Sequence, residues 1–332
     1  MPCTVVTGAF WGDEGKGKII SYLALKDQLD VCVRTGSVNA AHTVWYQGKR
    51  YALHMVPAAF INEKCRLLIG VGANVHIAQF FKEVEVTNVK NRIGIDHQAS
   101  IIQEKHSIQD KTNSHLKGVV GTTGWGVGPA IEERVRRSAK LAKDIPELQP
   151  YLTDVAREVN NAIDNGNKVL LEGVQGLMLS LFHGTYPYVT GRDTSASAIC
   201  SEAGVGPTKV NNVLIVFKAF MTRVGGGPLP GELPKEETIK RRWFEIAATG
   251  RERRAAPFNF ELAKKTVMIN GATQAAVTKL DILYLQCKGA RTYAELPEEA
   301  KQFINEIEKQ TGIPVVLIGT GPEALDIVDR RK

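Results

Sequence analysis

Short apolar runs recur along the chain, and most of them end in glycine or in a polar cluster. Runs of this kind are typical of strands buried on both faces of a parallel sheet. Helical patterns lie between several runs, at 148–166 and 296–312 for example. The sequence therefore predicts an α/β fold: a single large domain over residues 1–332, with a central, mostly parallel sheet flanked by helices and with loop and helical excursions. The expected strands span 4–8, 31–36, 66–72, 168–173, 212–220, 275–281 and 314–321.

Composition narrows the classes of function. No apolar run reaches the roughly 18 residues of a membrane span, no N-terminal stretch resembles a signal peptide, and the five cysteines are scattered singly. We therefore expect a cytoplasmic protein with reduced thiols and no membrane partner. The formal net charge of +7 suits anionic partners. No nucleic-acid-binding motif accompanies this charge, so we expect small anionic ligands and no nucleic acid.

One segment, GAFWGDEGKGKII at residues 8–20, is rich in both glycine and charge. Its glycines allow backbone N–H groups to converge on an anion, and the helix expected to follow presents its positive N-terminus to the same point. Two lysines add positive charge. The segment therefore predicts a phosphate-binding loop, whose members are expected to be Gly12, Glu14, Gly15, Lys16, Gly17 and Lys18.

This loop departs from the familiar phosphate-loop pattern at one position. The frame G-x-x-x-x-G-K fits from Gly12 to Lys18, but Ile19 stands where that pattern has a Ser or Thr. Asp13, inside the loop, offers a hard oxygen ligand for Mg²⁺ instead. Its carboxylate could also accept a proton from an acidic N–H of the substrate.

Other polar segments follow the expected strands, which is where ligands bind in open α/β sheets. In SVNAAHTV, His42 suits a general acid. The segment GTTGWGVGPA (121–130) offers N–H and hydroxyl groups to a phosphate, and the arginines of TGRERR (249–254) can clamp carboxylates. As a group these segments predict a site for several anions.

The segment TKLD (278–281) ends one of the apolar runs. Lys279 can lie over a purine face, while Asp281 can accept hydrogen bonds from the N1–H and 2-amino groups of guanine. A carboxylate only accepts, so it selects guanine over adenine. The spacing resembles the N-K-x-D element of GTP-binding proteins, with Thr278 in the place of Asn.

Taken together, these segments resemble the adenylosuccinate synthetase family, in order and over nearly the whole chain. The strings GDEGKGK and HGTYPYVT are highly specific to it. The resemblance is to the compact archaeal form and implies a P-loop-like GTP-binding ligase. GTP would phosphorylate O6 of a purine nucleoside monophosphate, and the amino group of L-aspartate would displace the phosphate. The matching strings are WGDEGKGK, NAAHTV, GTTGWGVGP, EGVQG, HGTYPYVT, TRVGGGPLPGEL, TGRERR, TKLD and GTGP.

The resemblance implies catalytic roles for three residues. The aspartate matching Asp13 removes the N1 proton and binds Mg²⁺, the histidine matching His42 donates to the phosphoryl oxygens, and Gln175 orients the 6-oxo region. The carbonyl of Ala41 is implied as a further metal contact. The GTP-binding residues that the resemblance implies are Gly12, Glu14, Gly15, Lys16, Gly17 and Lys18 in the loop, with Lys279, Asp281, Gly319, Thr320 and Gly321 around guanine.

The resemblance also implies how the two other substrates bind. Arg137 is expected to reach the 5′-phosphate from the neighbouring subunit, which would make a homodimer necessary for full activity. The residues implied for the purine monophosphate are Asn39, Thr123, Arg137, Gln175, Thr190 and Val224. Those implied for L-aspartate are Thr249, Arg251 and Arg253.

Several positions depart from the family pattern, and we expect most of them around the ribose and base of the acceptor. The changes favour dGMP slightly, as in viral synthetases that make 2-amino-2′-deoxy-N6-succinoadenylate for diaminopurine nucleotides; the location would then be the host cytoplasm. The retained Asp13 argues against dGMP, because it would crowd a 2-amino group. IMP is the alternative acceptor, with nearly equal weight. The departing residues are Phe10, Ala41, Gly226, Leu229, Gly231, Glu252, Ala256 and Pro257.

A remote alternative is a GTP-binding protein without catalysis. A switch needs neither the acid–base pair of Asp13 and His42 nor an arginine loop for aspartate. The sequence therefore favours the enzyme.

Overall fold

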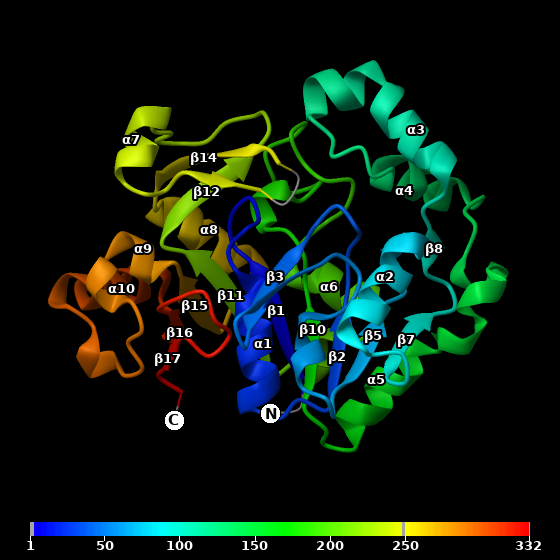
Figure 1. Cartoon of the computed structure of the whole chain (residues 1–332), viewed down its shortest axis with the longest axis horizontal. Coiled ribbons are helices and arrows are strands. Elements are labelled where there is room, and N and C mark those ends of the chain that lie inside the picture. The colour runs from blue at the N-terminus through cyan, green and yellow to red at the C-terminus, as the bar shows by residue number, and fades with distance from the viewer. Residues whose placement is uncertain (1–2, 248–249, 332) are drawn as a thin grey trace.

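The computed structural model describes residues 3–247 and 250–331. In this part of the chain ten strands form one large sheet, in which every neighbouring pair is parallel except the edge pair β16–β17. The central, mostly parallel sheet expected from the sequence is therefore confirmed (Figure 1). Across the sheet the order is β17 (Ile327–Asp329), β16 (Val315–Gly319), β15 (Gln274–Thr278), β11 (Asn212–Lys218), β1 (Cys3–Gly8), β10 (Val169–Glu172), β2 (Val31–Arg34), β5 (Arg66–Ile69), β7 (Ile93–Asp96) and β9 (Leu152–Thr153).

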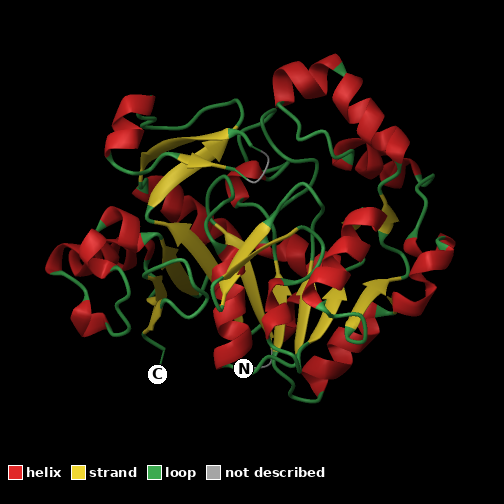
Figure 2. Ribbon diagram, in the orientation of Figure 1, coloured by secondary structure: helices red, strands yellow, loops and turns green. Residues whose placement is uncertain are grey.

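Helices cover both faces of this sheet, as Figure 2 shows. Successive side chains of a strand point to opposite faces. Val5 of β1 belongs to a buried cluster with α5 and α6, whereas Val6 packs in a cluster with α1 and α2. The helices are α1 (Lys16–Lys26), α2 (Ile77–Thr87), α3 (Glu104–Thr112), α4 (Val127–Arg136), α5 (Val155–Asp164), α6 (Ala196–Ala203), α7 (Lys235–Lys240), α8 (Phe260–Asn270), α9 (Leu280–Leu283) and α10 (Glu298–Thr311).

In the described part of the chain, one three-stranded sheet and two strand pairs lie outside the large sheet. β12 (Phe220–Val224), β14 (Glu252–Pro257) and β13 (Glu245–Ile246) form an antiparallel sheet beyond the carboxyl end of β11, with α7 beside it (Figure 1). β12 begins two residues after β11 ends, so the small sheet is fixed to that edge. The remaining strands are β3 (His42–Tyr46) with β4 (Lys49–Leu53), and β6 (Asn74–Val75) with β8 (Ser100–Ile101).

Three of the expected elements had wrong boundaries. The run 212–220 divides into β11 and β12, and the run 275–281 ends as a strand at Thr278. The helix expected over 148–166 begins only at Val155, after a 3₁₀ turn and the short strand β9, and the Asp154 side chain caps it by accepting from the Arg157 N–H at 3.0 Å. The helix expected over 296–312 is confirmed as α10.

No helix among the described residues has both the length and the apolar character that a bilayer crossing requires.

Candidate active site

Most of the predicted site residues that the structure describes lie in segments after strands of the large sheet, and parallel strands have their carboxyl ends at the same edge. Backbone strain marks this edge. Three non-glycine residues in the loops after β1, β10 and β15 have left-handed backbones, namely Asp13 (φ 61°), Gln175 (φ 64°) and Lys279 (φ 61°). Such conformations cost free energy and cluster at functional sites. The strain therefore supports the site independently of any motif.

Glu14 organises the glycine-rich loop from within. Its Oε1 accepts hydrogen bonds from the backbone N–H groups of Phe10 (3.0 Å) and Gly12 (2.8 Å). Its Oε2 is 2.8 Å from Nζ of Lys16, and both side chains are buried. The Glu14 carboxylate thereby holds the loop in shape and keeps the ammonium group of Lys16 next to it. Direct contact of Glu14 with GTP stays a prediction.

The start of α1 needs a glycine for a different reason. A Cβ at Gly17 would lie 2.9 Å from the carbonyl oxygen of Thr43 and 3.0 Å from Cβ of His42. Contacts this short do not occur in real structures, so only glycine lets the helix approach β3 so closely. The free N–H groups at the helix N-terminus, which suit a phosphate, consequently lie next to His42.

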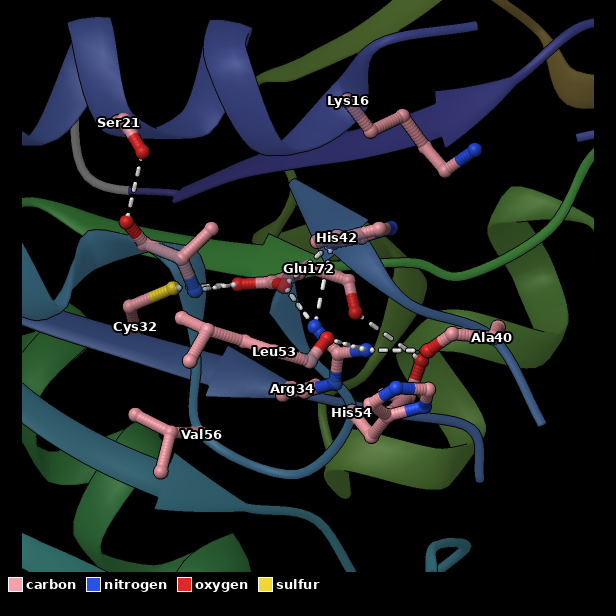
Figure 3. A network of polar contacts seen from close by, with 12 residues as sticks. Lys16, Ser21, Cys32, Arg34, Ala40, His42, Leu53, His54, Val56 and Glu172 are labelled. Atoms are coloured by element: carbon pink, nitrogen blue, oxygen red, sulfur yellow. Dashed lines mark hydrogen bonds and ion pairs between the residues drawn. The ribbon is translucent and has the colours of Figure 1, made fainter. Parts of the chain in front are cut away.

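His42 is held by a buried carboxylate (Figure 3). Its Nδ1 is 2.6 Å from Oε1 of Glu172, which also accepts from the Arg34 guanidinium at 2.5 Å. The other oxygen of Glu172 accepts from the Ala58 N–H at 2.8 Å. An ionised carboxylate only accepts, so Nδ1 of His42 carries a proton and donates it. This assignment leaves Nε2 as the working nitrogen.

Nε2 of His42 is buried and has no hydrogen-bond partner among the described residues. Burial, with a further contribution from the positive charge of Arg34, lowers the pKa of His42 to about 4. The imidazole alone is therefore neutral near pH 7. An anionic phosphoryl group beside Nε2 raises the pKa again. The arrangement thus suits a histidine that is protonated when a phosphate arrives.

Asp13, the predicted base, contacts a predicted aspartate-binding residue. Its Oδ2 lies 2.8 Å from Nε of Arg253. Arg251 donates to the carbonyl of Gly121 at 2.9 Å and so joins the arginine loop to the 121–130 segment. Thr249 lies outside the described residues. The sheet edge therefore brings the predicted base into contact with Arg253, while Arg251 contacts the 121–130 segment.

The predicted guanine residues form a second group at the same edge. Asp281 is buried, and burial raises the pKa of its carboxyl despite the nearby ammonium groups of Lys279 and Lys18. A Cβ at Gly319 would lie 3.2 Å from Cε of Lys18. Burial lowers the pKa of Lys18 to about 8, and its Nζ donates to the carbonyl of Glu323. Lys18 therefore joins the guanine side of the site.

The two sides of the nucleotide site touch through Thr278. Its hydroxyl donates to the carbonyl of Glu14 at 2.6 Å, so the end of β15 supports the glycine-rich loop. Thr320 is fully buried, and its hydroxyl donates to the carbonyl of Ala290 at 2.8 Å. The backbone of Thr320 is engaged as well, because its N–H donates to the Asp326 carbonyl and its carbonyl accepts from the Gly289 N–H, both at 2.9 Å. Gly321 follows Thr320 in the turn after β16.

Arg223 joins the two loops expected to hold the acceptor. Its guanidinium donates to the Thr185 hydroxyl (2.9 Å), the Pro228 carbonyl (2.7 Å) and the Tyr188 carbonyl (2.9 Å). The segment with Thr190 is thereby held against the end of β12, where Val224 lies. A buried arginine that bonds mainly to backbone carbonyls is a structural clamp.

The other predicted acceptor residues are placed less tightly. Asn39 and Ala41 are half-buried in the loop after β2, which Arg34 orders by donating to the Ala40 carbonyl at 2.9 Å. Thr123 is half-buried. Arg137 is exposed at the C-terminal end of α4, with φ 64°.

The donor set fits Mg²⁺ carried by a nucleotide. Magnesium is usually held by one or two carboxylates together with substrate phosphates. Asp13 supplies one carboxylate at the loop, and the described residues contain no group of three or more His, Cys, Asp or Glu that could hold a metal ion. A metal here would therefore take most of its ligands from phosphate and water.

Four residues of this site were missed in the sequence analysis. Two of them carry a recognisable signal: Arg34 and Glu172 are charged residues that each end an apolar run, and they face each other in register on β2 and β10. The other two depend on partners far away in the sequence. The four are Arg34, Glu172, Arg223 and Glu245, whose carboxylate contacts the guanidinium of Arg253 at 2.6 Å.

The fold and the site together define an α/β enzyme that binds nucleotides at the carboxyl edge of its sheet. A family model described as adenylosuccinate synthetase matches residues 5–147 and 139–286. The chain is 51% identical to the adenylosuccinate synthetase of Pyrococcus horikoshii and 49% identical to that of Methanocaldococcus jannaschii. Each alignment covers 100% of this chain, and 99% and 97% of those relatives. The chain belongs to the adenylosuccinate synthetase family and is a GTP-dependent carbon–nitrogen ligase of purine biosynthesis.

Solved structures agree with this assignment. Fully ligated adenylosuccinate synthetase from Plasmodium falciparum matches with a TM-score of 0.92 at 26% identity over 100% of both chains. Succinoaminodeoxyadenylate synthetase of cyanophage S-2L, bound to dGMP and dATP, matches with a TM-score of 0.84 at 20% identity, covering 99% of this chain and 95% of that one. The second likeness shows the shared fold alone.

The comparisons do not support the expected preference for dGMP, and they favour the IMP alternative. The structure gives a physical reason. Four of the eight departing residues are ordinary core or surface residues: Phe10, Leu229 and Ala256 are buried in one hydrophobic cluster. Glu252 is exposed and pairs with Lys235 at 2.6 Å. Substitutions in a core or on a surface carry no information about the acceptor.

Proposed function

We propose that this enzyme joins L-aspartate to C6 of IMP, using GTP and releasing GDP and phosphate. The observation that carries the proposal is the pairing of two proton-transfer groups at one sheet edge, the carboxylate of Asp13 and the unpartnered Nε2 of His42. The choice of IMP rests on relatives about half identical over the full chain that are named adenylosuccinate synthetase.

In the first step the oxygen of the purine attacks the γ-phosphorus of GTP. Asp13 takes the N1 proton, which moves negative charge onto O6 and makes it a nucleophile. The O6–P bond forms as the bond to GDP breaks. His42 donates from Nε2 to the phosphoryl oxygens, and Glu172 holds the resulting imidazolium in place. Gln175 orients the 6-oxo group.

In the second step the amino group of aspartate attacks C6, and phosphate leaves with the O6 atom. Arg251 and Arg253 bind the carboxylates of aspartate, as planar guanidinium groups do well. Arg253 is also paired with Asp13, so the aspartate site and the base share a cation. The 5′-phosphate of IMP is bound by Thr123 and Thr190.

Mg²⁺ would be held by Asp13, the Ala41 carbonyl and the GTP phosphates, and when bound it would neutralise charge on the phosphates. Lys279, Asp281 and the turn at 319–321 bind guanine. Arg137 contributes from the partner subunit of a homodimer. Its exposed position at the end of α4 supports this role.

The test is an assay with aspartate, GTP and Mg²⁺ in which IMP and dGMP are offered separately. Phosphate release and the succinylated product are both followed. We expect product with IMP and a much lower kcat/KM with dGMP. Phosphate release without a succinylated product, or a preference for dGMP, would overturn the proposal.

A further inference from the structure

One carboxylate of the small antiparallel sheet contacts three cations. Oε2 of Glu245 lies 2.6 Å from Nζ of Lys218 and 2.6 Å from a terminal nitrogen of Arg253. Its Oε1 lies 3.3 Å from Nζ of Lys279. Arg253 in turn contacts Asp13. Glu245 therefore connects the guanine-side lysine to the arginine beside the base.

Lys218 anchors this carboxylate and does not reach a ligand. It is the last residue of β11, its side chain is 1% exposed, and its Nζ also donates to the Thr222 hydroxyl at 3.1 Å. Nζ lies 4.6 Å from the ring centre of Phe220, which stacks on Trp243 two residues before Glu245. Hydrogen bonding at Lys218 and ring stacking at Trp243 therefore hold both ends of the Lys218–Glu245 ion pair in place.

The other two cations do reach the site. The side chains of Lys279 and Arg253 are 45% and 17% exposed, against 15% for Glu245 itself. Burial alone raises the pKa of the Glu245 carboxyl, but the three cations outweigh it and hold this pKa well below its usual range. The carboxylate is therefore ionised throughout the working pH range and constantly attracts both cations.

We propose that Glu245 is a positioning residue that sets the places of Lys279 for the donor base and of Arg253 for the aspartate carboxylate. This inference rests on the proposed function, which assigns those two ligands. The residue contacts neither substrate. It acts by holding the side chains of Lys279 and Arg253. Its loss should therefore weaken the binding of GTP and of aspartate and leave the binding of IMP unchanged.

The test is the variant Glu245→Gln in the full chain. Glutamine keeps the size of the side chain but removes its charge, so Lys279 loses its fixed position and Arg253 is left to Asp13 alone. We expect KM for GTP and KM for aspartate each to rise about tenfold, with KM for IMP within about twofold of wild type. The three constants are measured separately at saturating concentrations of the other substrates.

A matched control is Glu308→Gln. Glu308 also pairs with an arginine, Arg330, at 2.7 Å, and accepts from the Val315 N–H at 2.8 Å. It lies on α10 at the amino end of β16, the opposite edge of the sheet from the site. This variant should lower the melting temperature and leave all three KM values unchanged.

The outcomes separate this inference from the proposed function. If wild type forms no adenylosuccinate, the proposed function fails. If wild type is active and Glu245→Gln changes neither KM, changes only one, or raises all three alike, the positioning role is overturned. A paired rise confined to GTP and aspartate supports it.

Discussion

The carboxylate of Asp13 forms an ion pair with the guanidinium of Arg253, and this ion pair limits the contacts that either side chain can make with a substrate. Asp13 Oδ2 is 2.8 Å from the guanidinium. The same guanidinium also contacts Glu245 at 2.6 Å, so Asp13 is one of two carboxylates that hold Arg253. In the proposed function the carboxylate of the substrate aspartate would compete with Asp13 for the same cation.

The first prediction concerns this base. Asp13→Asn keeps the shape of the side chain but cannot accept the N1 proton, so turnover should fall by about three orders of magnitude or more. Initial rates of adenylosuccinate formation measure the effect, and IMP binding should persist. Near-normal turnover would show that another group is the base.

The second prediction uses the buried histidine. His42 has a pKa of about 4 when folded and an ordinary value of 6.5 when unfolded. Between these values the unfolded chain binds the proton and the folded chain does not. Stability from this group is therefore complete above pH 6.5 and is lost as the pH falls toward 4, by on the order of 3 kcal/mol.

Denaturant unfolding of wild type and His42→Asn at several pH values measures this loss. The difference between their free energies of unfolding should change across pH 6.5 to 4 and stay flat above 7. A difference that is constant over the whole range would contradict the buried neutral histidine.

The third prediction concerns donor choice. Asp281→Asn replaces an acceptor-only group with an amide that can also donate, so the discrimination against ATP should weaken by tenfold or more. The ratio of kcat/KM for GTP and ATP measures it. An unchanged ratio would mean that guanine is read elsewhere.

At the scale of elements, the start of α1 depends on its close approach to β3. Gly17→Ala places a Cβ 2.9 Å from the Thr43 carbonyl, so helix and hairpin must separate. We expect a loss of about 1–3 kcal/mol of stability and a lower kcat, because His42 begins that hairpin. Thermal unfolding and initial rates measure the two effects.

The control for this change is Gly206→Ala. Gly206 has φ −66°, and a Cβ there would meet nothing within 4 Å. Its stability and rate should match wild type. If Gly17→Ala matched this control in stability and rate, the close approach of α1 to β3 would not matter for stability or activity.

The sequence predicts the strands well because burial on both faces demands continuous apolar runs, as in β1 and β10. It predicts helix starts less well. The apolar spacing of 148–154 resembles a helix, but Leu152 pairs with Ile95 of β7 as a strand. Here a tertiary contact overrides the local pattern.

The same distinction holds for the site. Residues in dense motifs, such as Asp13 and His42, stand out because several special residue types are adjacent. Glu245 does not stand out, because its role comes from partners brought together by folding. Glu172 is recognisable as a charged residue at the end of an apolar run, but its partner is not. Glu172 meets Arg34 from 138 positions away. No local pattern encodes such a meeting.

At the scale of the whole molecule, the predicted homodimer can be tested by mixing two inactive variants. Arg137→Leu and Asp13→Asn should each be nearly inactive alone. In a hybrid dimer, the site containing an intact Asp13 would receive an intact Arg137 from its partner. Random re-association should therefore restore about a quarter of wild-type activity. Mixtures that stay inactive, although hybrid dimers form, would rule out action between subunits.

The strand order has a consequence for how such an enzyme can diversify. Guanine-side residues follow β15 and β16, while the histidine and acceptor segments follow β2 and β10, and β1 with its loop stands between these two groups. The loop touches the first group through Thr278 and the second through Phe10, whose carbonyl accepts from the Met178 N–H at 2.8 Å. We therefore expect substitutions on one flank to leave the other largely intact, except at Glu245, which contacts both Lys279 and Arg253. A lineage that keeps Glu245 would then be able to change its phosphoryl donor and its acceptor in separate steps.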